Sequence, residues 1–461
     1  MNRGETKMAY SSASGDFNMA LGGDCMLTRR LSIYDEPEFL ALRKHFTDCD
    51  AGFVNLESVV RHWSEGVPGI TRGTFMTTPP ELLADLRWFG VNIVSCANNH
   101  AFDYGEGGLV ATMQHLDRHG IARAGSGHNL AEARMPGYLE TRGGRVALLA
   151  TTATYRDWNR AGAQRPDLRG RPGVNPFSSS TKITLDAAAF DEMKRMSREL
   201  GFEQARARDR THFFSDKEAP PDRAEELQIF GQHFVRGDAF HQSSAGDPDD
   251  IADHLRWVRE ARRQADWVVM SFHTHDFAHG SFAKAKTKVD LQEPADYVPA
   301  FARAAIDAGA DMFVGHGSHT PLGIEFHKGK PIFYSVGNMF FQNETVPFFP
   351  DEAYRRFGLG PDATPADFLD TRTGGGTKGH IAHAGFWENI AATCHYRGGK
   401  LDHVKIIPIH QGHGLSRAQR GRPLLATGTV AAGIIDRVAS LSAPYGVKVE
   451  RMGDIGVVRP T

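Results

Sequence analysis

The chain has 461 residues, enough to bury a large core in one big domain with insertions or in two domains. Lysine and arginine total 53 against 55 aspartates and glutamates, and a net charge of -2 offers no basic field for nucleic acid or an anionic membrane. Four widely spaced cysteines without a CxxC pair argue against a disulfide framework and a thiolate zinc site. We therefore expect a small-molecule or peptide-like substrate, with no nucleic-acid or membrane partner; the oligomeric state is left open.

The first residues of the chain do not resemble a targeting segment. Residues 1–24 lack the apolar stretch of about 7–15 residues that a signal peptide needs, and no run of about 18 apolar residues occurs in the chain. We expect a cytoplasmic location in a reducing compartment.

Residues 16–154 alternate between strand-like and helix-like patterns. Short apolar runs predict strands, and between them apolar residues recur every three to four positions, which predicts amphipathic helices. This order is typical of βαβ units in a mostly parallel, layered sheet. The predicted strands cover 17–23, 52–58, 91–96, 121–127 and 145–151, and the predicted helices cover 37–46, 79–90 and 107–120.

Residues 155–249 break this alternation and are rich in Arg, Asp, Pro, Ser and Gly. Helical patterns occur at 186–200 and 223–234, and no segment has a convincing strand pattern. We interpret this stretch as an insertion or cap that sets specificity. Arg156, Trp158, Arg160 and Arg169 are possible substrate contacts, although solvated loop charges are the more common interpretation of such residues.

The alternation resumes over residues 250–461, which we interpret as the second half of the same domain. Helices are expected at 253–266 and 296–309, and strands at 267–272 and 311–315. Hairpins are expected over 323–338, around a Lys-Gly turn, and over 386–409, around a Gly pair. A final helix at 429–446 and a strand at 447–452 complete the pattern.

Candidate metal ligands follow the predicted strands one after another. Because the carboxyl ends of parallel strands meet at one edge of a sheet, these residues should come together although they are distant in sequence. Carboxylate and amide oxygens combined with imidazoles suit a divalent transition metal, Mn, Zn, Fe or Ni. A bridging carboxylate, Glu57 or Asp24, could hold two ions. The candidates are Asp24, Glu57, Asn99, His100, His273, His316 and His319.

Each candidate also has a structural interpretation. Asp24 could be a turn residue or helix cap, and Asn98 and Asn99 could cap the following helix. Among 22 histidines, chance clusters are expected. We interpret His115, His119, His128, His254 and His327 as such background, and only one or two histidines of HTHDFAH (273–279) can reach the site. Repeated placement at strand ends favours the functional interpretation.

Other catalytic motifs are absent from the sequence. It contains no GxxxxGK[ST] loop, since GGGTKG near Lys378 lacks that spacing, and it has no GxSxG elbow and no HExxH pair. A P-loop enzyme, a serine hydrolase of that type and an HExxH protease are therefore disfavoured.

Six motifs in order resemble one known family. GGDCML, FVNLES, ANNHAFDYG, FHTHDFAHG, VGHGSHT and KPIFYSVGNMFF are similar to the bacterial capsule-synthesis family of CapA or PgsA type (PGA_cap), a branch of the calcineurin-like metallophosphoesterases. The resemblance covers about residues 18–342 and resumes weakly to 458. It implies a four-layer α/β/β/α sandwich with a large irregular insertion. It also implies metal positions at Asp24, Glu57, Asn99, His273, His316 and His319, with His100 as the acid.

The chain departs from that pattern at two positions. Dimetal phosphoesterases carry a histidine two residues after the first aspartate, where this chain has Met26. One ion is then weakly held or missing, so the resemblance implies one or two ions. In the HWG-type motif this chain has His273-Thr274-His275, which makes His275 a candidate substitute ligand.

Three functions compete at this stage. The first is a metal-dependent hydrolase, in which a metal-activated water attacks a phosphoester, ester or amide while His100, oriented by Asp103, protonates the leaving group. The second is a metal-independent acid/base enzyme such as an epimerase, because the family includes one and Met26 replaces a ligand. The third is an accessory protein of poly-γ-glutamate capsule synthesis.

Overall fold

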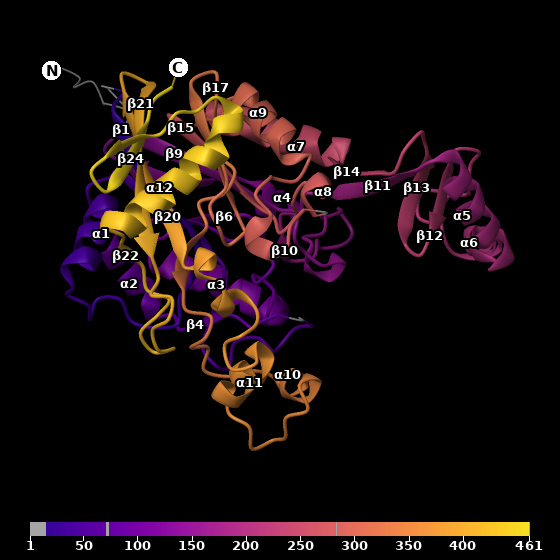
Figure 1. Cartoon of the computed structure of the whole chain (residues 1–461), viewed down its shortest axis with the longest axis horizontal. Coiled ribbons are helices and arrows are strands. Elements are labelled where there is room, and N and C mark those ends of the chain that lie inside the picture. The colour runs from indigo at the N-terminus through magenta and orange to yellow at the C-terminus, as the bar shows by residue number, and fades with distance from the viewer. Residues whose placement is uncertain (1–14, 71–72, 283, 461) are drawn as a thin grey trace. The chain divides into compact units, whose positions relative to one another are not determined.

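The computed structural model describes residues 15–70, 73–282 and 284–460 (Figure 1). They form a mixed α/β structure with several sheets, as the alternating pattern predicts. Contacts divide the chain into two compact units: the first contains residues up to 177 together with 251–276 and 299 onward, and the second contains 178–250 and 277–298. Residues 1–14, which carry much of the stretch considered for a signal peptide, lie outside the described residues.

The first unit contains a sheet that has ten strands within the described residues. Its order is β23-β24-β21-β20-β1-β2-β5-β6, with β19 beside β1 and β22 beside β21. Strands β1, β2, β5 and β6 run parallel, whereas β20 runs antiparallel to β1. The strands are β1 (Phe17–Met26), β2 (Ala51–Leu56), β5 (Ile93–Ser95), β6 (Ala122–Ala124), β19 (Asn338–Phe341), β20 (Glu388–Arg397), β21 (Lys400–His410), β22 (Leu424–Leu425), β23 (Glu450–Met452) and β24 (Ile455–Val458).

The second sheet of this unit has six strands in the described part of the chain, in the order β17-β18-β16-β15-β9-β8. Its central strands β9, β15 and β16 are parallel, and their register places His273 beside both Thr152 and His316. The strands are β8 (Gly137–Thr141), β9 (Gly144–Thr152), β15 (Trp267–His273), β16 (Met312–His316), β17 (Ile324–His327) and β18 (Lys330–Phe333).

Apolar side chains join the two sheets in one buried cluster. Leu21 and Phe53 of the first sheet belong to the same cluster as Leu148 and Val314 of the second. The central strands are buried over nearly their whole length, as expected for strands covered on both faces. The sheets therefore share a core, and the polar groups at their strand ends lie at the margin of that core.

Helices of the first unit pack against both sheets. Apolar residues of α1, α2 and α3 cluster with β1, β2 and β5. On the second sheet, Phe272 packs against Phe177 and against Phe301 of α9, with ring centroids 5.0 and 5.6 Å away. The helices of the first unit are α1 (Pro37–Thr47), α2 (Leu82–Phe89), α3 (Gly105–Arg118), α4 (Leu130–Arg134), most of α7 (Pro248–Arg262), nearly all of α9 (Val298–Ala308), α10 (Asp351–Arg356), α11 (Pro365–Thr373) and α12 (Gly428–Ser442).

Both predicted hairpins are confirmed. Lys328 and Gly329 join β17 to β18 with positive φ angles of 52° and 73°, and Gly398 and Gly399 join β20 to β21 with φ angles of 55° and 79°. Two successive residues with positive φ are typical of two-residue hairpin turns, because the twist of such turns matches the twist of the paired strands. Short paired strands β3 (Val59–Val60) and β4 (Thr77–Thr78), and β7 (Ser126–Gly127) and β10 (Gly173–Val174), complete the first unit.

The second unit has its own small sheet, in the order β12-β13-β11-β14, drawn in magenta with helices α5 and α6 (Figure 1). The elements are β11 (Ser179–Leu185), β12 (Glu226–Ile229), β13 (Gln232–Arg236), β14 (His241–Gly246), α5 (Ala187–Glu199), α6 (Phe202–His212) and α8 (His279–Phe282).

The sequence-based prediction for this second unit was wrong in two respects. Residues 223–234 contain a hairpin instead of a helix, and strands are present where none was expected. Leu227 and Ile229 alternate with more exposed neighbours, and Phe230-Gly231 forms a turn with both φ angles positive. Short apolar runs fit either period, and here cross-strand pairing decided the structure.

Candidate metal centre

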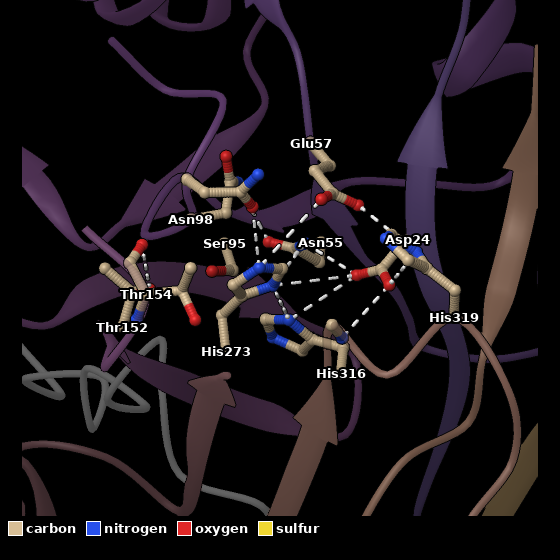
Figure 2. A network of polar contacts seen from close by, with 12 residues as sticks. Asp24, Asn55, Glu57, Ser95, Asn98, Thr152, Thr154, His273, His316 and His319 are labelled. Carbon is tan, nitrogen blue, oxygen red and sulfur yellow. Dashed lines mark hydrogen bonds and ion pairs between the residues drawn. The ribbon is translucent and has the colours of Figure 1, made fainter. Parts of the chain in front are cut away.

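Three candidate ligands lie at or near the carboxyl ends of central strands, one in the first sheet and two in the second. Asp24 lies on β1, and His273 and His316 are the last residues of β15 and β16. All three side chains are fully buried. Figure 2 shows them converging with Glu57 and His319. The fold thus brings together residues that are almost three hundred positions apart, as the strand-end argument predicts.

The carboxylate of Asp24 is at the middle of the cluster. One of its oxygens, Oδ1, lies 3.8 Å from His273 Nδ1 and 3.7 Å from His316 Nδ1. The other, Oδ2, lies 3.2 Å from His319 Nδ1 and accepts a 3.0 Å hydrogen bond from the Gly317 amide. One oxygen therefore faces nitrogen atoms at the ends of β15 and β16, and the other faces nitrogen atoms of the loop after β16.

Glu57 is the first residue after β2 and belongs to the same cluster as Asp24. Its Oε1 is 3.9 Å from His273 Nε2 and 3.9 Å from His100 Nε2, and its Oε2 is 4.0 Å from His319 Nδ1. The side chain is fully buried. Two buried carboxylates that share the imidazoles of His273 and His319 match the arrangement expected of a bridged pair of ions.

The backbone next to His319 is shaped for the site. Gly317 has a φ of 101°, and an added Cβ would come within 2.6 Å of the Thr274 carbonyl oxygen. His319 itself has a φ of 62°, a conformation that side chains other than Gly, Asn and Asp rarely adopt. Strain of this kind persists only where surrounding contacts enforce it, and it gathers at functional sites.

Neighbouring polar side chains orient the candidate ligands. Ser271 Oγ lies 2.7 Å from His316 Nε2, and Asn338 Oδ1 lies 3.0 Å from His319 Nδ1. Asn55 donates to Asp24 Oδ1 at 2.9 Å and lies 3.3 Å from His273 Nδ1. Sequence reasoning missed these residues. Only Asn55 gave a usable signal, because it lies two positions before Glu57 in the motif FVNLES.

The loop after β5 supplies the remaining predicted residues. Asn99 Oδ1 accepts from His273 Nε2 at 2.9 Å, and Asn98 donates to Asn55 Oδ1 at 3.1 Å. His100 Nδ1 lies 2.6 Å from Asp103 Oδ2, which also accepts from the Met76 amide at 2.8 Å. The carboxylate of Asp103 therefore holds Nδ1 of the His100 ring, and Nε2 of the same ring lies 3.9 Å from the carboxylate of Glu57.

Burial sets the protonation of the cluster. It lowers the pKa of His316 to about 4, although the Asp24 carboxylate opposes this. Burial and the neighbouring imidazoles hold the pKa of His273 well below its usual value. Burial alone would raise the pKa of Asp24, but the hydrogen bond and charge of His319 and the charge of His316 lower it. Near neutral pH His273 and His316 are thus neutral and Asp24 is ionised, the forms that bind metal.

Burial raises the pKa of Asp103, and the adjacent His100 only partly offsets this. The contact between the two side chains is therefore a short hydrogen bond in a place where burial makes a charge on Asp103 costly.

The donor atoms are close enough to hold ions. In each of three groupings, one ligand atom per residue lies within 4.8 Å of the others: Asp24 with His273 and His316, Asp24 with Glu57 and His319, and Glu57 with His273 and His275. The residues present therefore fit one or two divalent ions, and His275 joins the centre as its place in the HTH motif suggested. Met26 is buried at the end of β1, and its thioether is a poor donor for hard metal ions.

His380 is a residue near the centre that the sequence gave no reason to choose. Its ring lies 5.1 Å from that of His319 and 4.5 Å from that of Phe386. It comes from a glycine-rich stretch that does not follow a predicted strand, so the strand-end argument could not find it.

Two of the possible substrate contacts lie against aromatic rings. The guanidinium of Arg156 lies over the ring of Trp158, and that of Arg160 lies over the ring of Tyr155. Their role in binding a substrate stays a prediction.

Comparison with known proteins agrees with the motifs. The family model described as bacterial capsule synthesis protein PGA_cap matches residues 18–343, which include every residue of the three groupings. The chain belongs to the PGA_cap family. Sequence resemblance to that family is therefore confirmed.

Relatives of this PGA_cap member differ in how much of the chain they cover. The uncharacterized protein y4sH of Sinorhizobium fredii is 29% identical over 99% of this chain and 97% of its own length. The PGA biosynthesis protein CapA of Bacillus subtilis is 23% identical over 58% of this chain and 47% of its own. A probable polyglutamine synthesis accessory protein of Mycobacterium tuberculosis is 37% identical over 20% of this chain and 21% of its own.

Within residues 15–70, 73–282 and 284–460, none of the helices combines the length and the apolar composition that a bilayer span requires.

Proposed function

We propose that this protein is a metal-dependent hydrolase that cleaves a phosphoester, ester or amide of a small or peptide-like substrate. The observation that carries the proposal is the buried set of Asp24, Glu57, His273, His316 and His319 at the strand ends, whose donor atoms lie within bonding reach of shared positions. Burying two carboxylates among imidazoles is costly for folding, which favours a functional reason for keeping them.

The ligand set supports Mn, Zn or Fe as the ion, because it mixes carboxylate oxygens with imidazoles. Asp24, His273 and His316 would hold one ion, and Glu57 with His275 or His319 would hold a second, with Asn99 beside His273. When bound, a divalent ion lowers the pKa of a water molecule and polarises the oxygen of the bond to be cleaved.

His100 is the proposed general acid. Its Nδ1 is held 2.6 Å from Asp103, which fixes the ring and leaves Nε2 to carry the transferred proton. The same Nε2 lies 3.9 Å from Glu57. A proton carried there is next to the centre and available to the leaving group.

An accessory role in poly-γ-glutamate synthesis is a second candidate, supported by the similarity to the PGA biosynthesis protein of Bacillus and to the probable polyglutamine synthesis accessory protein of Mycobacterium. A metal-independent epimerase is a third, supported by Met26 in place of a usual ligand. A hydrolytic centre is compatible with the accessory role, whereas an epimerase would use the histidines as acid and base without metal.

Two further points belong to this proposal. The four-layer α/β/β/α arrangement is supported by the core shared between the sheets and by the helices packed outside each. A cytoplasmic location is supported by free cysteines, Cys25, Cys49, Cys96 and Cys394, in the described part of the chain.

Chelation tests the proposal against the epimerase. Treating purified protein with EDTA should abolish hydrolysis of a panel of phosphoesters, esters and amides, and Mn²⁺ or Zn²⁺ should restore it. Activity that survives EDTA, with deuterium from solvent entering the Cα position of an amino-acid or peptide substrate, would contradict hydrolysis and support the epimerase.

A further inference from the structure

We propose that His62, Glu65 and His115 form a separate metal site that takes a zinc-type divalent cation. His62 and Glu65 lie in the loop after β3, and His115 lies on α3. One ligand atom from each of the three lies within 4.8 Å of the other two. No member of this set belongs to the buried centre, so the inference does not depend on the proposed function.

The three side chains already converge. His115 Nε2 lies 2.7 Å from Glu65 Oε2, and the rings of His62 and His115 meet edge to face with centroids 5.1 Å apart. In a tetrahedral zinc site neighbouring ligand atoms are about 3.3 Å apart, given metal–ligand bonds of about 2.0–2.1 Å. An ion would therefore replace the direct contact between His115 and Glu65 with a small outward shift.

The loop that carries two of the ligands is held in place by its own backbone. The Glu65 amide donates to the His62 carbonyl at 3.0 Å, and the Arg61 guanidinium donates to the Glu65 carbonyl at 2.6 Å while stacking on Tyr104. The spacing of His62 and Glu65 is thus fixed before any ion binds, which lowers the entropy cost of binding.

The three side chains differ in solvent exposure, as expected of a metal site that is open to solvent on one side. The His115 side chain is 4% exposed and that of Glu65 is 29% exposed, whereas His62 lies at the surface. Two imidazoles and one carboxylate leave a fourth position for water, which is the ligand set of open zinc sites. A cation can enter from the His62 side and reach a buried imidazole.

Such an ion would fasten the loop to α3 beside the proposed acid. The Gly69 amide donates to the Asp103 carbonyl at 2.8 Å, and Asp103 in turn holds His100. The same loop exposes Trp63, Val67 and Ile70. The ion would therefore fix the loop after β3, with its exposed apolar side chains, next to the motif ANNHAFDYG.

Zinc stoichiometry of the intact protein tests the site. After dialysis against Zn²⁺ buffered at a micromolar free concentration, we expect His62→Ala and Glu65→Gln each to bind one equivalent less than the unchanged protein. His128→Ala is the matched control, because His128 forms an exposed pair with Glu132 that has only two ligands. His316→Ala should instead lower binding at the buried centre and keep the equivalent that His62→Ala removes.

Equal stoichiometry in His62→Ala and the unchanged protein would overturn the inference, and so would binding that appears only above micromolar Zn²⁺. Anomalous diffraction at the zinc edge gives an answer that does not depend on variant folding. A peak among His62, Glu65 and His115 supports the site, and density for zinc at the buried centre alone contradicts it.

Discussion

The buried centre of the first unit and the surface of the second unit hold their carboxylates differently. In the first unit Asp24 and Glu57 are wholly buried and lie 3.8 and 3.9 Å from ring nitrogens of the equally buried His273. On the surface of the second unit Arg236 pairs with the 63% exposed side chain of Asp191. Exposed pairs contribute little to stability, and buried ones cost free energy unless something compensates them. The difference indicates that the buried set is kept for chemistry.

Replacing the shared carboxylate should produce the largest effect. Asp24 belongs to two of the three groupings, so we expect Asp24→Asn to lose at least one equivalent of metal and to reduce hydrolysis to background. Asp191→Asn is the matched control from the second unit and should keep its metal. Elemental analysis gives the metal content of both variants, and turnover assays give their activity. Full metal content in Asp24→Asn would show that the buried carboxylate matters no more for metal binding than the exposed one.

His100→Asn should have a smaller effect of a different kind. Loss of a positioned proton donor costs about 10²–10⁴-fold in rate, while metal content should stay unchanged because Asn99, not His100, is the expected ligand. The loss should shrink for nitrophenyl esters, whose leaving groups depart without protonation. Equal losses on good and poor leaving groups would assign His100 to binding or to metal ligation.

The metal-free protein should lose stability in mild acid. Because His316 has a pKa of about 4 in the folded state and about 6.5 when unfolded, the unfolded state binds more protons between these values. The free energy of unfolding should therefore fall as pH drops from about 6.5 to 4, by up to about 3 kcal/mol from this residue. Urea denaturation at several pH values measures the slope, which His316→Asn should reduce. An unchanged slope would show that His316 titrates normally.

Among these changes, removing most of the second unit should affect the metal centre least. Ser179 pairs with Gly246, and the Asp247 amide donates to the Ser178 carbonyl at 2.8 Å, so residues 179–246 can be replaced by a short turn. We expect unchanged metal content and loss of turnover on the natural substrate. A folded truncation with full turnover would refute the cap interpretation, and one without metal would refute the independence of the two regions.

The sequence predicted the centre far better than the insertion, for a physical reason. Strand ends are visible as the points where apolar runs stop, and parallel strands bring those points together, so Asp24, His273 and His316 could be chosen without coordinates. His380 comes from a glycine-rich stretch whose position depends on tertiary packing. The hairpin at 226–236 was misread because strands of four and five residues carry too few positions to separate a period of two from 3.6.

The residues that orient the ligands were only partly predictable from the sequence. Ser271 lies two positions before His273, so strand alternation puts it on the same face, but serine is too common in strands to be chosen on that ground. Asn338 reaches His319 only because the turn after β18 returns the chain to β1. Supporting contacts of this sort depend on register, which the pattern of apolar residues leaves open.

The metal content of the purified protein tests the central claim most directly. Protein expressed in medium supplemented with Mn and Zn, then dialysed, should hold one or two equivalents of transition metal that depend on Asp24 and His316 and that EDTA removes together with activity. Protein that contains no transition metal after this treatment, or that keeps the same metal content when Asp24 and His316 are both replaced, would contradict the account.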